Sequence, residues 1–177
     1  MNKPYLEIHS GEKHIIGEYF TPCIETIAKS LAYTNRFNGR AGNYSVAAHS
    51  MFVANLLPDE LKLAGLLHDA HECYIGDMPS PLKKLVPEYV KLESFYQNVI
   101  ADYYNVDTQH PDVIKADMTA LYAESKVFKM PLISESMKRI GCEYRNENFG
   151  YTSISHPQPP QQVYNHFLHT FRILTGE

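Results

Sequence analysis

Apolar residues recur three and four positions apart along most of the chain, a spacing that places them on one side of a helix. Strict alternation of apolar and polar residues, which is typical of half-buried strands, is scarce. The pattern therefore predicts an all-α fold. The predicted helices cover residues 22–32, 44–57, 61–74, 88–104, 113–128 and 163–174.

Turn-forming residues separate the predicted helices. Thr21 followed by Pro22 is typical of a helix N-terminus, and Pro58 ends the second helix. Residues 35–43 and 145–162 are predicted as loops, because Asn, Gly, Ser and Pro concentrate there.

The first residues follow a different pattern from the rest of the chain. Apolar and polar residues alternate on both sides of Ser10 and Gly11, which predicts a small β-hairpin. The chain has 177 residues, 44% of them hydrophobic and 20% charged, enough to bury a substantial core. We therefore expect one compact helical bundle over residues 1–177, with the hairpin at its start.

Charge and cysteine usage narrow the classes of function. The formal net charge is -4 and basic residues occur only in short pairs such as Lys83-Lys84, so nucleic-acid binding is not expected. No stretch approaches the roughly 20 apolar residues of a membrane span, and the first residues lack a secretory apolar segment. Three well-separated cysteines, Cys23, Cys73 and Cys142, favour neither a disulfide framework nor a thiolate zinc site. A soluble cytoplasmic protein is expected.

The segment LLHDAHE, residues 66–72, places ionisable residues inside an apolar run. On a helix, His68, Asp69 and Glu72 share an arc of roughly 100°, opposite the leucines of the segment. The same arc carries Gly65 rather than lysine or glutamine, so it is predicted to face the interior. Burying ionisable groups costs free energy unless they are paired.

Two other predicted helices repeat this conflict. His49 shares its helical face with Phe52 and Val53, and Asp117 shares its face with Leu121. A single histidine on an apolar face is usually a hydrogen-bonded core residue. Three coincident cases instead favour a bound divalent cation, with imidazole and carboxylate ligands from three helices.

The order His49, then His68-Asp69, then Asp117 resembles the H…HD…D signature of HD-domain metal-dependent phosphohydrolases. The surrounding segments resemble those of small HD nucleotidases, both bacterial 5'-deoxynucleotidases and phage dATP triphosphohydrolases. These segments are RFNG (36–39), YSVAAHS (44–50), GLLHDAHECYIGDMPSPLK (65–83) and KADMTALYAE (115–124). The resemblance covers roughly residues 19–130 and implies the helical HD-domain fold.

The resemblance also implies a metal centre. Its ion would be Zn²⁺, Mn²⁺ or Co²⁺, with a second ion such as Mg²⁺ entering with the substrate. Such an ion makes water nucleophilic at neutral pH without a serine or cysteine. The implied ligands are His49, His68, Asp69 and Asp117.

Further residues are assigned to catalysis and phosphate binding. Glu72, one turn beyond His68, is the predicted general acid/base, and Asp77 resembles the second catalytic acid of the family. His71 lies about 60° from His68, toward the apolar side, and is predicted to pack beside the ligands rather than to bind metal. Three basic residues are predicted to neutralise phosphate oxygens: Arg36, Lys83 and Lys115.

The resemblance implies a small deoxynucleotide as substrate and a homo-oligomeric enzyme. The short chain and the NRFNG segment, residues 35–39, favour a dATP-type triphosphohydrolase that releases deoxynucleoside and tripolyphosphate. The alternative is a 5'-deoxynucleotidase that acts on deoxynucleoside monophosphates. Phe37 follows Arg36 where the 5'-deoxynucleotidases typically have tryptophan, a departure that bears on substrate choice.

A function of another class stays open at this stage. HD-type sites also occur in dinuclear iron oxygenases and in nucleotide sensors, which keep metal ligands without hydrolysing phosphate. The acids Glu72 and Asp77 argue against a sensor. Additional histidine ligands would favour an oxygenase, and His71 is the candidate beside the HD pair.

Overall fold

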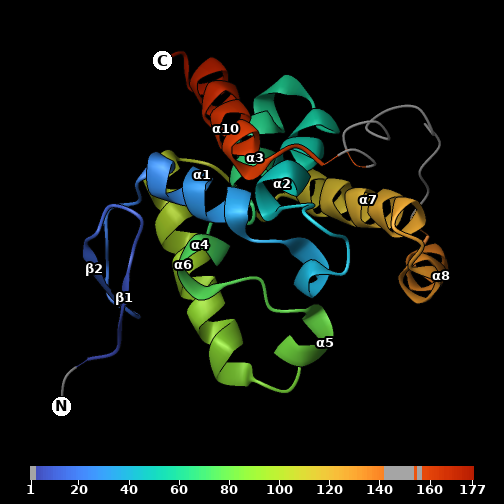
Figure 1. Cartoon of the computed structure of the whole chain (residues 1–177), viewed down its shortest axis with the longest axis horizontal. Helices are drawn as coiled ribbons and strands as arrows, with labels where there is room; N and C mark the ends of the chain where they lie inside the picture. Colours follow the sequence, from blue (N-terminus) through green and yellow to red (C-terminus); the bar gives the residue numbers. More distant parts are fainter. Residues whose placement is uncertain (1–2, 142–153, 155–156) are drawn as a thin grey trace.

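The chain folds into a helical bundle with a short antiparallel hairpin at its N-terminus, as the computed structural model in Figure 1 shows. The structure describes residues 3–141, 154 and 157–177. The predicted all-α fold with a small hairpin is confirmed. The predicted loop over 145–162 lies mostly outside the described residues. Among the helices that are described, none is long and apolar enough to cross a bilayer.

The hairpin is attached to the bundle by a buried histidine. Strands β1 (Tyr5–Glu7) and β2 (Lys13–Ile15) are antiparallel, with Leu6 opposite His14. The His14 side chain is buried, and its Nε2 lies 2.7 Å from the hydroxyl oxygen of Tyr96. Since an isolated hairpin is marginally stable in water, this contact with the bundle helps to hold it in place.

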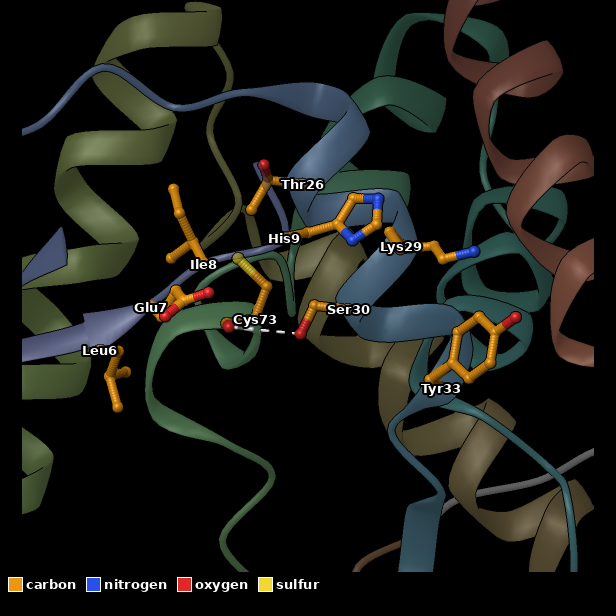
Figure 2. Close-up of a pocket in the computed structure, with 9 residues that line it drawn as sticks. All are labelled: Leu6, Glu7, Ile8, His9, Thr26, Lys29, Ser30, Tyr33 and Cys73. Atoms are coloured by element: carbon orange, nitrogen blue, oxygen red, sulfur yellow. Dashed lines mark hydrogen bonds between the residues drawn. The ribbon is translucent and has the colours of Figure 1, made fainter. Parts of the chain in front are cut away.

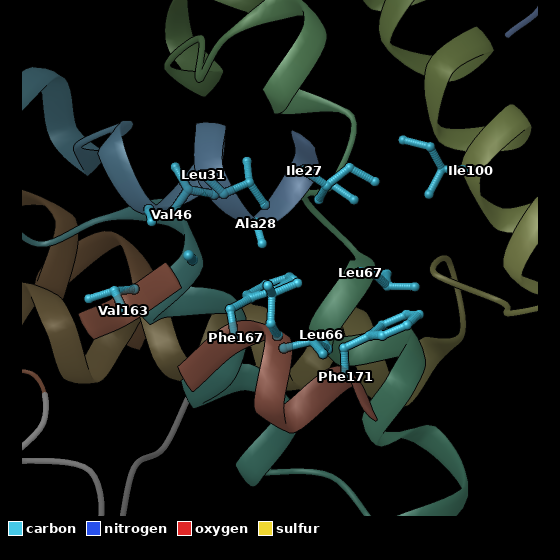
Figure 3. Packing of buried hydrophobic residues seen from close by; sticks show 14 of the residues in the cluster. Ile27, Ala28, Leu31, Val46, Leu66, Leu67, Ile100, Val163, Phe167 and Phe171 are labelled. Carbon is cyan, nitrogen blue, oxygen red and sulfur yellow. The ribbon is translucent and has the colours of Figure 1, made fainter. Parts of the chain in front are cut away.

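Four helices contribute most of the buried residues of the main apolar core. They are α1 (Ile24–Tyr33), α2 (Val46–Asn55), α3 (Lys62–Leu67) and α10 (Pro160–Thr175). Figure 3 shows Leu31 of α1, Leu66 of α3 and Phe167 of α10 side by side, all of them fully buried. Burying one such side chain contributes about 1.5–3 kcal/mol, so this core accounts for much of the stability of the bundle.

The helix starts differ from the predicted ones by one to three residues. Helix α1 begins at Ile24 rather than at Pro22, because Cys23 keeps an extended backbone (φ -118°, ψ 120°) and serves as the N-cap. Helix α10 begins at Pro160, before the first residue of the apolar repeat at Val163. Proline is favoured in the first turn because its missing N–H has no helical partner there.

A second apolar cluster joins α2 to α7. Helices α6 (Pro87–Tyr104) and α7 (Pro111–Val127) confirm the predictions over 88–104 and 113–128. The cluster contains Tyr44, Phe52, Val53, Val113 and Ala120. Two further helices, α5 (Ser80–Lys83) and α8 (Pro131–Arg139), escape prediction because one has four residues and the other buries no side chain.

Gly65 allows α3 to approach α2 closely. A short turn, η2 (Asp59–Leu61), leads into α3. A Cβ atom at Gly65 would overlap Leu57 Cδ1 and lie 3.2 Å from Ala54 Cα. The absence of that atom therefore allows α3 to lie directly against the C-terminal end of α2.

The predicted helix over 61–74 is interrupted within LLHDAHE. Helix α3 ends at Leu67, and α4 (Glu72–Ile75) begins after a turn. This turn has hydrogen bonds between residues three apart, such as Glu72 N to Asp69 O at 3.0 Å. Side chains three apart eclipse in such a turn, so Asp69 and Glu72 face the same way. Four residues are too few for an apolar pattern to distinguish this turn from an α-helix.

Candidate metal centre

The four predicted ligands come together from three parts of the fold. His49 lies in the middle of α2, His68 and Asp69 follow α3, and Asp117 lies on α7. His49 Nε2 is 3.1 Å from Asp117 Oδ1 and 3.6 Å from Asp69 Oδ2. His68 Nε2 is 3.2 Å from Asp69 Oδ2 and 3.9 Å from Asp117 Oδ1. Ligands bound tetrahedrally at 2.0–2.2 Å lie roughly 3.3–3.6 Å apart, so these spacings fit a small divalent ion.

Both histidines present the same nitrogen to the cluster. His49 Nδ1 donates to Glu124 Oε1 at 2.6 Å, and His68 Nδ1 donates to the carbonyl oxygen of Gly65 at 2.8 Å. A carboxylate and a carbonyl only accept, so each Nδ1 carries the hydrogen. Both Nε2 atoms are buried and have no hydrogen bond of acceptable geometry among the described residues. Their lone pairs are therefore available to a metal ion.

The surrounding carboxylates favour the positively charged form of both imidazoles. Burial and the charge of Arg36 oppose protonation of His49, but Glu124 and Asp117 outweigh them and raise its pKa to about 9. Burial likewise opposes protonation of His68, and Asp69 outweighs it and raises the pKa. The excess negative charge that retains these protons also favours a bound cation.

A strained turn carries Arg36. The segment η1 (Arg36–Gly39) contains two left-handed residues, Phe37 (φ 56°) and Asn38 (φ 52°). Left-handed backbone at residues other than glycine costs about 1–3 kcal/mol each, and such strain is concentrated at functional sites. Arg36 N donates to Tyr44 O at 2.9 Å, which fixes the turn against the start of α2.

The Arg36 guanidinium contacts both a buried glutamate and one of the candidate ligands. Its Nη2 lies 3.2 Å from Glu124 Oε2, and its Nη1 lies 3.6 Å from Asp69 Oδ2. The Tyr44 hydroxyl donates to Glu124 Oε1 at 2.9 Å. The sequence analysis assigns no role to Glu124, although it lies seven residues after Asp117, two helical turns along the same face.

Glu72 is buried beside Asp69, as the turn geometry requires. Its Oε2 has no hydrogen-bond partner among the described residues. Burial and the charges of Asp69 and Asp77 raise the pKa of Glu72 well above its usual value. Burial also raises the pKa of Asp77, which follows the left-handed Gly76 after α4. Carboxyl groups whose pKa is raised by burial and by neighbouring carboxylates are suited to proton transfer.

Lys83 and His71 meet at a second buried glutamate, Glu93 of α6. Lys83 Nζ donates to Glu93 Oε1, and His71 Nε2 lies 3.2 Å from the same oxygen. His71 is buried, and its Nδ1 has no hydrogen-bond partner among the described residues. Since Asp69, His71 and Glu72 also form a group that could hold a metal ion, the packing role of His71 stays a prediction. Glu93 was not predicted as a site residue.

A polar cavity of about 210 Å³ is lined both by candidate metal ligands and by the Lys83–Glu93 pair. Its walls include the candidate ligands His68, Asp69 and Asp117 as well as Lys83 and Glu93. Three polar residues outside the predicted site also line the cavity: Gln97, Thr108 and Gln109. A small phosphorylated molecule bound there would therefore contact ligands and lysine together.

Lys115 is the predicted site residue that the structure does not bring to the cluster. It is exposed and lines a separate cavity with Leu56, Leu57 and Thr119. Two residues before Asp117 on a helix corresponds to about 200° of rotation, which turns its side chain to the other side of α7.

A larger cavity, about 350 Å³, lies between β1 and α1 and contains none of the predicted site residues. Figure 2 shows Lys29, Ser30 and Tyr33 of α1 on one side and β1 on the other. The Ser30 hydroxyl donates to the Cys73 carbonyl oxygen at 3.3 Å. This cavity therefore borders the helix that begins with Glu72, and it is distinct from the polar cavity.

The chain is similar to bacterial proteins, two of which have no named activity. No protein-family profile matches the chain. It is 37% identical over 105 residues to the uncharacterized protein YfdR of Escherichia coli (strain K12), covering 58% of this chain and 59% of YfdR. It is 41% identical over 81 residues to the uncharacterized protein RCAP_rcc00048 of Rhodobacter capsulatus, covering 40% and 41%.

A 5'-deoxynucleotidase of Yersinia pestis (strain Pestoides F) is 30% identical over 70 residues, covering 37% of this chain and 36% of that protein. The chain spans less than two thirds of the length of each of these curated relatives. Two groups of histidine and carboxylate side chains among the described residues could hold a metal ion.

Proposed function

We propose that this protein is an HD-domain phosphohydrolase that uses Zn²⁺, Mn²⁺ or Co²⁺ to hydrolyse 2'-deoxynucleoside 5'-monophosphates. The observation that carries the proposal is the convergence of two buried, unpartnered Nε2 atoms, of His49 and His68, on the carboxylates of Asp69 and Asp117. The glutamate and carbonyl acceptors orient both imidazoles for metal binding, a common arrangement at protein metal sites. The similarity to 5'-deoxynucleotidases supports the reaction class.

The comparisons favour deoxynucleoside monophosphates as substrates. The chain length and the NRFNG segment instead favoured triphosphates. The relatives with a named activity are 5'-deoxynucleotidases, which were the alternative in the sequence analysis. The charges of Arg36 and Lys83 act on Glu72 and Asp77, whereas Lys115 faces another cavity. Two basic side chains and one divalent ion match a single phosphate better than the larger charge of a triphosphate.

The side chains of the site have complementary tasks. When bound, the ion would supply Lewis-acid polarisation of the phosphoryl group and acidify a water molecule. Lys83, on the wall of the polar cavity, and Arg36, beside Asp69, neutralise the phosphate oxygens. Glu72 takes the proton of the attacking water as the new P–O bond forms. Asp77 gives a proton to the leaving 5'-oxygen as its bond to phosphorus breaks, which yields deoxynucleoside and orthophosphate.

The test is an assay with a panel of deoxynucleoside mono-, di- and triphosphates. The purified protein is stripped of metal, reloaded separately with each of the three ions, and its products are resolved. Release of deoxynucleoside and orthophosphate from monophosphates supports the proposal. Release of tripolyphosphate with monophosphates left intact would instead favour the triphosphohydrolase. Stoichiometric iron with charge-transfer absorption and no phosphatase activity would favour the oxygenase.

A further inference from the structure

Glu93 is a buried carboxylate that the proposed reaction does not yet use. It belongs to α6, and only 8% of its surface is exposed. A buried carboxylate is costly unless charged or hydrogen-bonding partners compensate it. Its location on the wall of the polar cavity, with His68, Asp69 and Asp117, suggests a role beyond packing.

The partners of Glu93 come from two elements on opposite sides of the catalytic acids in the sequence. Lys83 closes the four-residue helix α5, and His71 belongs to the turn before α4. Both contact the same oxygen, Oε1. Burial alone would raise the pKa of Glu93, but hydrogen bonds from His71 and Lys83 and the charge of Lys83 lower it. The carboxylate therefore stays ionised at neutral pH and can hold an ammonium group.

Lys83 is the partner that can reach a ligand. Its side chain is 24% exposed and lines the polar cavity. Its charge acts on both Glu72 and Asp69, so it lies within electrostatic range of the reacting groups. An ammonium has three N–H donors, and a single bond to Glu93 leaves others for phosphate oxygens.

Holding a lysine in place matters because its free side chain is flexible. An unrestrained lysine loses conformational entropy when it is fixed on a ligand, which weakens binding. A buried partner that fixes the side chain beforehand removes part of this loss at the moment of binding. Helix α5, with four residues, is itself too short to provide such rigidity.

We propose that Glu93 is a positioning residue that holds Lys83 toward the substrate phosphate. Through its contact with His71, Glu93 also connects Lys83 to the turn of residues 68–71, the proposed metal-binding turn. The inference rests on the proposed phosphohydrolase function, which it deepens by assigning the source of phosphate affinity. Glu93 acts through Lys83 and does not touch the substrate. The alternative is a purely structural tether between α5 and α6.

A double-mutant cycle tests this inference in the full-length, metal-loaded protein. The variants are Glu93→Gln, Lys83→Met and the double substitution, with inorganic phosphate as the probe in titration calorimetry. We expect the Kd for phosphate to rise about 10-fold in each single variant and no further in the double variant, because Glu93 acts through Lys83. With a deoxynucleoside monophosphate, KM should rise in parallel while kcat changes little.

Matched controls are available on the same elements. Lys84 and Glu88 are exposed neighbours on the chain, so Lys84→Met and Glu88→Gln should leave phosphate binding within about 2-fold of the parent. If Glu93→Gln does not fold, Glu93→Asp, which keeps the charge on a shorter side chain, is expected to weaken binding by a smaller factor.

Three outcomes would overturn the inference. The first is a Glu93 variant with a lower Tm but unchanged Kd for phosphate, as a structural tether predicts. The second is a double variant whose effect is the sum of the two single effects. The third is a parent protein that does not bind phosphate at all. Phosphate binding without hydrolysis of any nucleotide would refute the proposed function, while the cycle would still decide the role of Glu93.

Discussion

Two buried glutamates near the candidate metal centre, Glu124 and Glu93, have similar sets of partners. Glu124 contacts an imidazole and a guanidinium, His49 and Arg36, and Glu93 contacts an imidazole and an ammonium, His71 and Lys83. In both cases a carboxylate fixes one histidine and one basic side chain. The two groups differ in what their histidine can bind.

Burial separates the two groups. Glu124 is fully buried, and its partner His49 presents Nε2 to the other candidate ligands. Glu124 therefore belongs to the candidate metal centre. Glu93 borders the polar cavity, and its histidine uses Nε2 for the glutamate instead. The comparison teaches that one chemical arrangement can orient a proposed metal ligand in a closed interior and a proposed phosphate-binding cation at a cavity wall.

The largest effect is expected from removing a ligand. Asp117→Ala deletes a carboxylate that lies 3.1 Å from His49 Nε2, so metal content should fall to a small fraction and turnover to background. Because metal binding to the native state contributes to stability, the Tm in the presence of metal should also fall by several degrees. Metal analysis and calorimetry on one preparation check both effects. Full metal retention would refute the ligand assignment.

The next effect concerns proton transfer without loss of metal. Glu72→Gln keeps the size of the side chain but cannot exchange a proton, so turnover should fall about 10² to 10⁴-fold with metal content unchanged. A simultaneous loss of metal would identify Glu72 as a ligand. Near-parental turnover would remove it from the mechanism.

A smaller effect is expected from the glutamate behind His49. Glu124→Gln can still accept the His49 hydrogen bond through its amide oxygen, but it loses the charge that faces Arg36. Loss of such a partner typically lowers metal affinity about 10–100-fold, which competition with a chelator would measure. Glu135→Gln, on the exposed face of α8, is the matched control. Equal affinities in the two variants would deny Glu124 this role.

The smallest effect is a pH dependence of stability that comes from Glu93. Its pKa is lowered in the folded protein, so its contribution is complete above the ordinary glutamate value of about 4.5 and is lost as pH falls further. In chelator, the Tm difference between the parent and Glu93→Gln should be constant from about pH 7 to 5 and narrow below about 4.5. A difference that stays constant down to about pH 3.5 would show that the charge of Glu93 adds no stability.

The convergence of the proposed ligands could be predicted because each one breaks an apolar helical pattern. His49 and Asp117 stand among core residues of their own helices, and the pattern alone shows the conflict. Glu124 could have been found by the same logic, since it follows Asp117 by two turns. The position of Lys115 outside the site could also have been predicted, because two residues on a helix turn its side chain about 200° away from that of Asp117.

Other features were beyond the sequence. Glu93 lies 10 residues from Lys83 and 22 from His71, and no periodicity links them, because their contacts depend on how α5 and the metal-binding turn pack against α6. The change from helix to turn after Leu67 depends on backbone hydrogen bonds that side-chain patterns do not record. Tertiary packing therefore decides what the local pattern leaves open.

The most direct test of the account is a titration of the metal-free protein with Mn²⁺ while hydrolysis of a deoxynucleoside monophosphate is followed. The account predicts that orthophosphate release is absent without metal, rises in proportion to added ion and levels off at one bound ion per chain. Hydrolysis that persists unchanged in chelator, or no monophosphate hydrolysis at saturation with Mn²⁺, Zn²⁺ or Co²⁺, would contradict it.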